Sequence, residues 1–431
     1  MAGANRAGVG VIPARPPRDV RLDIVRGWLQ LTIFASHVTG SFIGGWMIHA
    51  SWGLSDSSEQ FVFLSGFTLG SVFARKAARG GWRSGAWDLL ARTRRLYLRQ
   101  LLVFVLFGAM IALAGATCLP GEPERLGWAY AIAHPIAAIP GGLTMLYQPV
   151  DMGILPVFVW SMLLLPAFAA SEAAWGGWAL LPSAMLYLLA YGFGLSPLGL
   201  DGTGIGFNPF AWQFVFLTGA WLGRRALLEG EALPFRSRWA PWVTVVAVSV
   251  VLIGFALRLV WYRFIPLAAP FEQTRWIVGK ETVALPRLLH AWSLAWLVAY
   301  FVPRNAQWMH GAIPRAMAAI GRYSLDVFCL GLFLSWGAAT VLRLAPPMAG
   351  LDPLLIGAGC LLLAAFAQWL DRRRESKDRG DRLTISRALA PTGCSVPASA
   401  PAPCVYANFS AALPPRGCAA PPAPPPRAAS E

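Results

Sequence analysis

Charged residues are scarce in this chain. They make up 13% of its 431 residues, whereas a soluble protein carries roughly 25%. Hydrophobic residues make up 56%, and apolar runs of about 20 residues, long enough to cross a lipid bilayer, recur along the sequence. The composition therefore excludes an ordinary soluble protein and predicts an all-α, polytopic integral membrane protein.

Cysteine motifs are also lacking, and we expect no cleavable leader. The six cysteines form no C-x-x-C pair and no paired spacing with histidine, so neither a zinc site nor a disulfide framework is indicated. We predict no metal and no permanently bound cofactor. The first apolar run is not followed by a convincing signal-peptidase site, and we interpret it as a retained helix.

Basic residues are plentiful but dispersed. The chain has 36 Lys and Arg against 21 Asp and Glu, a net charge of +15. These cations lie between the apolar runs and form no continuous patch, so we exclude nucleic acid as a partner. They are instead typical of the excess of Lys and Arg in the cytoplasmic loops of membrane proteins.

Ten transmembrane helices are predicted from the apolar runs, with the lipid bilayer as their partner. They cover residues 24–46, 57–75, 96–116, 152–170, 178–195, 208–224, 240–262, 287–302, 316–342 and 353–370. A broken apolar stretch at 130–146 is either an eleventh span or a re-entrant element. If it does not cross, every basic cluster falls on the cytoplasmic side with both termini. If it crosses, Arg224–Arg238 lies outside, so we prefer ten helices.

Three segments follow from these runs. Residues 1–20 are predicted to be a disordered basic segment, 21–371 the membrane domain, and 372–431 a disordered Pro/Ala-rich cytoplasmic tail.

A polar stripe follows the first predicted helix, in the segment RLDIVRGWLQLTIFASHVTGS. Arg26 and His37 are eleven residues apart and share a helix face within about 20°. Asp23, Gln30 and Ser41 fall within about 60° of that face. At 1.5 Å per residue, His37 lies about 16 Å deeper than Arg26, near the middle of the bilayer.

This stripe has two interpretations. An imidazole facing the bundle interior exchanges a proton near neutral pH and suits a general base. Equally, His37 is a histidine hydrogen-bonded between helices. Asp23 and Arg26 are either part of a site or an ion pair at the membrane interface.

Further along, Glu59 enters an apolar run at its predicted outer end. It either orients a histidine and stabilises its charge or is solvated at the interface. Arg92 and Arg95 precede the third predicted helix. They either reflect topology alone or form a cradle for phosphate oxygens.

Together these segments resemble the membrane acyltransferase-3 superfamily, and within it the OpgC branch. The resemblance rests on RLDIVRG with the Arg-x10-His spacing of Arg26 and His37, on EQFVFLSGFT from Glu59, and on the Arg-x-x-Arg pattern of Arg92 and Arg95. Phrases at 208–223, 285–298 and 320–331 (NPFAWQFVFLTGAWLG, LPRLLHAWSLAWLV and IGRYSLDVFCLG) are similar to the OpgC branch specifically.

The resemblance implies O-acyl transfer in the bacterial inner membrane. A cytoplasmic acyl-CoA, in the namesake branch a succinyl donor, would supply the acyl group to a periplasmic glucan or other envelope carbohydrate. His37 would be the catalytic base and Glu59 would set the charge of the site. Asp23, Arg26, Arg92 and Arg95 would bind the donor. His290 would bind the acceptor, or alternatively make only a structural hydrogen bond.

Two other classes of function are left open. A transporter or exporter could relay protons through His37 and Glu59, although such proteins are commonly built from repeated halves and no internal repeat is evident. A sensor or scaffold would leave the polar stripe unexplained.

Overall fold

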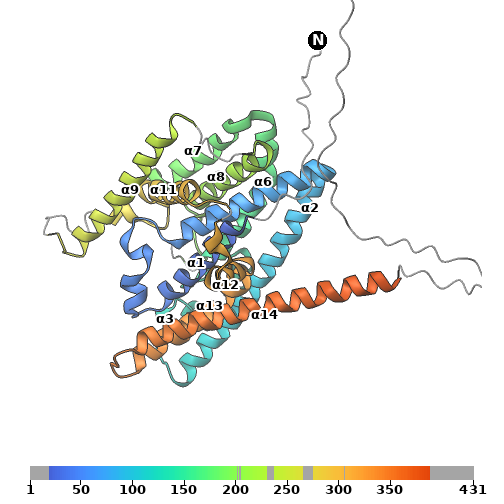
Figure 1. The fold of residues 1–431 in the computed structure, drawn as a ribbon. Coiled ribbons are helices and arrows are strands. Elements are labelled where there is room, and N and C mark those ends of the chain that lie inside the picture. The colour runs from blue at the N-terminus through green and yellow to red at the C-terminus, as the bar shows by residue number, and fades with distance from the viewer. Residues whose placement is uncertain are drawn as a thin grey trace, which may run out of the picture. The chain divides into compact units, whose positions relative to one another are not determined.

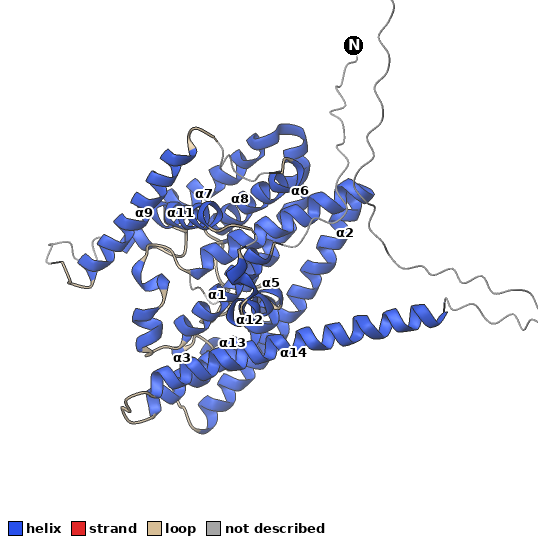
Figure 2. Ribbon diagram, in the orientation of Figure 1, coloured by secondary structure: helices blue, strands red, loops and turns tan. Residues whose placement is uncertain are grey.

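The computed structural model describes residues 19–200, 202, 205–230, 237–265, 275–304 and 306–388. Within these ranges the chain forms helices and no strand, which confirms the all-α prediction (Figures 1 and 2). The chain divides into two compact units, Met1–Ser376 and Lys377–Glu431. Residues 1–18 of the predicted disordered segment 1–20 and the end of the predicted tail lie outside the described residues, while Val20 already belongs to the first helix.

Helix α1 (Val20–His37) begins at Asp19, whose carboxylate accepts a hydrogen bond of 3.1 Å from the backbone N–H of Arg21. It packs along α12 (Ala312–Arg322), with α13 (Ser324–Leu344) beside it. Gly27 on α1 lies against the Met317 backbone, and Gly321 on α12 lies against the Asp23 backbone. The missing side chains let these two backbones approach closely.

Two predicted spans differ from the helices observed. The first, 24–46, is too long, because α1 ends at His37 and the chain turns at Gly40, which has φ 89°. A short π-helix (Ile43–Met47) and a 3-10 turn (His49–Trp52) follow. The predicted span 316–342 is interrupted at Tyr323, where α12 ends and α13 begins.

Helix α2 (Ser57–Thr117) contains the predicted spans 57–75 and 96–116 on its two limbs. The limbs meet at a kink where Gly80 and Gly81 leave helical geometry, and Gly81 has φ 77° (Figure 1). A residue with a side chain disfavours that conformation, so glycine permits the sharp reversal. The first limb begins with a capping box between Asp56 and Glu59.

The first limb of α2 packs along α8 (Pro209–Leu228). Two Gly-x-x-x-Gly motifs meet there. A Cβ atom on Gly66 or Gly70 would overlap the backbone of α8, and one on Gly219 or Gly223 would overlap the backbone of α2. Small residues at this spacing allow helices to approach closely in a membrane, where van der Waals packing drives association.

The segment 130–146 forms two short helices, α4 (Ala129–Ala133) and α5 (Pro135–Thr144), which are separated at His134. They follow α3 (Glu122–Arg125). Ten helical residues extend only about 15 Å, half of the hydrocarbon thickness, so neither helix crosses the bilayer by itself.

The remaining predicted spans also fall on helices. These are α6 (Ile154–Trp175), α7 (Leu180–Phe193), α9 (Ala240–Trp261), α11 (Leu285–Phe301) and α14 (Leu351–Ala388). Among the described residues, five helical segments are long and apolar enough to cross a membrane: Ser57–Thr117, Ile154–Phe193, Ala240–Trp261, Ser324–Leu344 and Leu351–Lys377. Ten crossings and cytoplasmic termini stay predictions. Helix α14 continues past residue 371, so the start of the predicted disordered tail is helical up to Ala388.

Candidate active site

The polar stripe of α1 faces its neighbouring helices. Asp23 and Gln30 of this stripe are buried, and Thr32, on another face of the helix, is buried as well. The Thr32 hydroxyl lies 2.7 Å from the Ser57 hydroxyl, which links α1 to the start of α2. Burying a polar group in an apolar interior costs free energy unless the group is paired or functional. Each buried polar side chain of α1 therefore needs a partner or a role inside the bundle.

His37 is the last residue of α1. Its Nδ1 lies 3.5 Å from Oδ1 of Asp151, an arrangement that becomes an ion pair when the ring is protonated. Asp151 adopts φ 70°, an uncommon backbone conformation for a residue with a side chain. A histidine beside a carboxylate can accept a proton while the carboxylate stabilises the resulting charge. Sequence reasoning did not select Asp151.

A charged cluster anchors the loop that carries Asp151. The N–H of Val150 donates to the Leu126 carbonyl oxygen at 3.0 Å. Next to Leu126, Arg125 pairs with Glu122, which also accepts from Trp336 Nε1 at 2.8 Å and pairs with Arg343 at 2.8 Å. Since Trp336 and Arg343 belong to α13, Glu122 ties the loop to that helix.

Glu122 is only 3% exposed, yet its carboxyl group stays ionised. The hydrogen bond from Arg125, together with those from Trp336 and Arg343, outweighs its burial and lowers the pKa of Glu122 to about 2. The cluster is therefore charged throughout the physiological pH range.

A small pocket lies between α1 and α13, beside His37. Its walls are mostly apolar, and its free volume is about that of one water molecule. It is lined by Gln30, Ile33, Phe34, His37, Val327, Phe328, Gly331, Leu332, Ser335 and Leu363. The imidazole thus borders a small and mostly apolar space.

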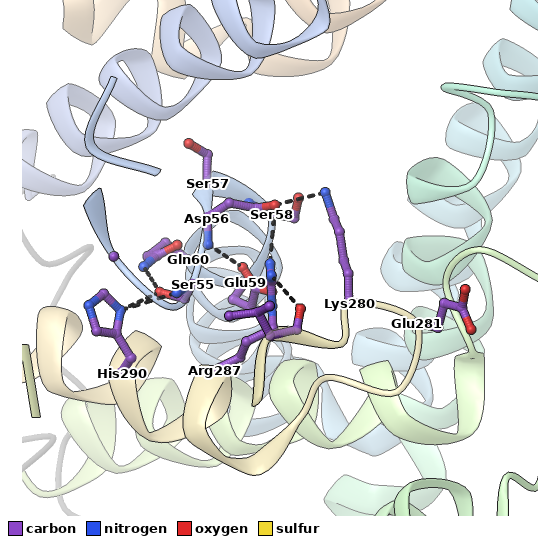
Figure 3. Close-up of polar contacts among 12 residues, drawn as sticks. Ser55, Asp56, Ser57, Ser58, Glu59, Gln60, Lys280, Glu281, Arg287 and His290 are labelled. Atoms are coloured by element: carbon purple, nitrogen blue, oxygen red, sulfur yellow. Dashed lines mark hydrogen bonds and ion pairs between the residues drawn. The ribbon is translucent and has the colours of Figure 1, made fainter. Parts of the chain in front are cut away.

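Glu59 lies in a second cluster, at the start of α2 (Figure 3). Its side chain is fully buried, and its Oε1 accepts from Arg287 Nε at 2.7 Å. Its Oε2 accepts from the Asp56 N–H at 2.9 Å. Arg287 and Lys280 also pair with the Asp56 carboxylate, at 3.1 and 2.8 Å. The carboxylate observed beside His37 is therefore Asp151, while Glu59 pairs with Arg287.

Asp56 is ionised in this cluster. Burial alone would raise its pKa, but the charges of Lys280 and Arg287 hold the pKa of Asp56 well below its usual range. Arg287 was also not among the site residues predicted from the sequence. An arginine inside an apolar run needs a buried acidic partner, and the isolated Glu59 was available as that partner.

His290 joins the same cluster from α11 and is 3% exposed. Its Nδ1 lies 2.7 Å from the Ser55 hydroxyl, which also accepts from Gln60 at 3.0 Å (Figure 3). Gly53 and Gly254 lie against the ring so closely that a Cβ on Gly53 would clash with it. This packing fixes the ring beneath the chain that leads into α2.

The four predicted donor-binding residues lie on α1 and on the second limb of α2. Arg26 Nη2 donates to the Leu64 carbonyl oxygen at 2.8 Å and to the Thr68 hydroxyl, on the first limb. Arg92 and Arg95 lie on the second limb, beyond the kink. Arg92 pairs with Asp88 at 2.9 Å, and Arg95 is exposed. Their donor-binding role, and that of the buried Asp23, stays a prediction.

The described residues contain no group of three His, Cys, Asp or Glu side chains placed to hold a metal ion.

The family model described as OpgC protein matches residues 18–375 of this chain. The chain belongs to the OpgC family. OpgC membership and the apolar helices together make this chain a membrane protein and a transferase of glucan modification. No curated protein and no solved structure matches the chain.

Proposed function

We propose that this OpgC-family chain transfers an acyl group from cytoplasmic acyl-CoA to a hydroxyl of a periplasmic glucan or related envelope carbohydrate. The observation that supports this best is the His37–Asp151 pair, which stands beside a confined pocket at the end of α1. A base, an orienting carboxylate and a small apolar pocket suit acyl transfer. Succinyl is the acyl group that the OpgC branch suggests.

The proposed reaction balances without a metal or a redox partner. The acceptor hydroxyl oxygen attacks the thioester carbonyl carbon while His37 takes the hydroxyl proton. The tetrahedral intermediate then collapses, the C–S bond breaks, and His37 returns the proton to the departing sulfur. The products are the carbohydrate ester and free CoA. Asp151 stabilises the imidazolium that exists between the two proton transfers.

The donor approaches from the inner side in this proposal. Arg26, Arg92 and Arg95 supply guanidinium groups for the CoA phosphates, which suit the fork of N–H donors on arginine. Asp23, one turn before Arg26 on the same helix, orients this end of the site. The thioester carbonyl is placed at the pocket between α1 and α13 that His37 lines.

The acceptor approaches from the outer side. We assign the cluster of Glu59, Arg287 and His290 to support of this entrance, because it fixes the chain from Gly53 to Asp56 that leads into α2. Arg258 adds to this support by donating from α9 to the Gly53 carbonyl oxygen at 2.8 Å. Both termini then lie in the cytoplasm and the protein crosses the inner membrane several times.

The test is His37→Ala in a strain that relies on this chain, with extracted glucans analysed by mass spectrometry. The expected result is loss of the ester-linked acyl group at normal protein abundance. His134→Ala is the matched control, since His134 is exposed on the surface between α4 and α5. Unchanged acylation by His37→Ala, in cells with no second copy, contradicts the proposal.

A further inference from the structure

Gln30 lies two helical turns before His37 on α1, and both line the pocket between α1 and α13. Seven residues correspond to about 700°, so the two side chains share one face of the helix. Gln30 is 2% exposed, and its Nε2 is a buried donor with no hydrogen-bond partner among the described residues.

Such a donor is unusual in a folded protein. An unpaired buried polar group costs about 1–3 kcal/mol, and over nine-tenths of buried polar groups have a partner. Methionine or leucine would fill the same space without this cost. Two other polar side chains line the pocket, His37 and Ser335, and the Ser335 hydroxyl already donates to the Leu332 carbonyl oxygen at 3.0 Å. The unpaired amide of Gln30 is therefore a hydrogen-bond donor that is available to a ligand there.

We propose that Gln30 donates a hydrogen bond to the thioester carbonyl oxygen and stabilises the oxyanion that forms when the acceptor attacks. This inference rests on the proposed acyl transfer and names the residue that binds the reacting carbonyl. Free space about the size of one water molecule also matches a single oxygen atom.

The spacing of the two residues fits this role. Their Cα atoms are separated by about 10 Å along the helix axis. In the reacting complex, the nitrogen of the base binds the attacking hydroxyl and the nitrogen of the donor binds the carbonyl oxygen. Usual hydrogen-bond lengths and the forming bond place these two nitrogen atoms at most about 9 Å apart. Gln30 lies toward the end of α1 that carries Arg26, and His37 lies toward Asp151. This order along α1 matches an acyl-CoA that enters from the cytoplasmic side and a carbohydrate that enters from the outer side.

The test measures acyl transfer and thermal unfolding of the purified full-length protein, with succinyl-CoA as donor and an unmodified glucan as acceptor. Gln30→Met keeps the volume and removes the donor. We expect kcat to fall about 100-fold, as for other oxyanion donors, with KM for succinyl-CoA nearly unchanged. The melting temperature should stay the same or rise, because an unsatisfied polar group has been removed.

The control is Gln213→Met. Gln213 is also a buried glutamine, but its Nε2 donates to the Ser183 carbonyl oxygen at 3.0 Å, and it is absent from the pocket wall. We expect unchanged kcat in this variant.

Three outcomes separate the claims. Normal kcat in Gln30→Met, in a protein that loses activity with His37→Gln, overturns the role of Gln30 and leaves acyl transfer standing. A lower melting temperature with a proportional loss of active protein shows a structural glutamine and also overturns it. Wild-type protein that forms no ester with succinyl-CoA or acetyl-CoA contradicts the proposed function itself.

Discussion

Asp151 supplies the carboxylate of a site of which the sequence analysis predicted only His37. His37 and the Arg-x10-His spacing stand out because a polar stripe inside an apolar run is costly. Asp151 stands in a loop far along the chain, and no helical period relates it to α1. Only the fold of the segment between α5 and α6 brings its carboxylate to 3.5 Å from His37.

Asp151→Asn should lower kcat about 10- to 100-fold, as the loss of an orienting partner does in other sites. The KM for acyl-CoA should change little, because Asp151 acts on the charge of His37 and not on donor binding. The measurement is the initial rate of ester formation across donor concentrations. Asp371→Asn, which removes a carboxylate paired with Arg322, is the control. A normal kcat in Asp151→Asn would mean that His37 works without this carboxylate.

Glu122 gives a prediction about pH. Its folded pKa of about 2 lies below the ordinary value near 4.5, so its charge stabilises the fold fully above pH 4.5. That contribution is lost as pH falls from 4.5 toward 2. Glu122→Gln should lower stability by about 2 kcal/mol at pH 7 and by progressively less below pH 4.5.

Thermal unfolding of the wild-type protein and of Glu122→Gln, both in detergent between pH 7 and pH 3, measures this loss of stability. The exposed Glu124 in the same short helix provides a control, Glu124→Gln, with an expected change near zero. A deficit of Glu122→Gln that is the same at pH 3 as at pH 7 would refute the assignment of a depressed pKa.

At the scale of elements, hydropathy predicted where helices form better than where they end. Residues 24–46 look continuous because apolar side chains continue past His37. The turn at Gly40 depends on a backbone conformation that hydropathy does not record. The break at Tyr323 was not predicted, although Gly321 lies two residues before it. Pro135 marks the break that was predicted within 130–146, since α4 and α5 are separated at His134, whereas α5 continues through Pro140.

The close packing of α2 against α8 depends on the glycines between them, and this can be tested. Gly70→Leu should abolish stable insertion or strongly reduce abundance, because even its Cβ would overlap the Ala220 backbone. Gly192→Ala in α7 is the control, because nothing lies within 4 Å of a Cβ there. Membrane abundance by immunoblot and the melting temperature in detergent are measured together. Normal abundance of Gly70→Leu would show that the two helices are farther apart than described here.

At the scale of the whole molecule, the charge pattern predicts orientation. The exposed Cys118 follows α2 and belongs to the segment 117–151, which is expected outside. A membrane-impermeant maleimide should therefore label wild-type protein in right-side-out spheroplasts, and Cys118→Ser should remove that label. The tail cysteines should react only after lysis. Labelling of Cys118 only after lysis would reverse the topology and the direction of transfer.

Family membership, fold class and the polar first helix could thus be inferred from residue types, spacing and hydropathy alone. The pairing of Glu59 with Arg287 and the burial of His290 could not, because they depend on which helices become neighbours. Three of the predicted donor-binding residues are arginines, and a cluster of arginines has the same composition whether it binds phosphate or sets topology.

The central claim is that His37 catalyses acyl transfer across the membrane. It is tested most directly in proteoliposomes that enclose the acceptor glucan, with radiolabelled succinyl-CoA added outside. Wild-type protein should build labelled ester on the enclosed glucan, and His37→Gln, reconstituted in equal amount, should build none. Equal labelling by both proteins would contradict the account.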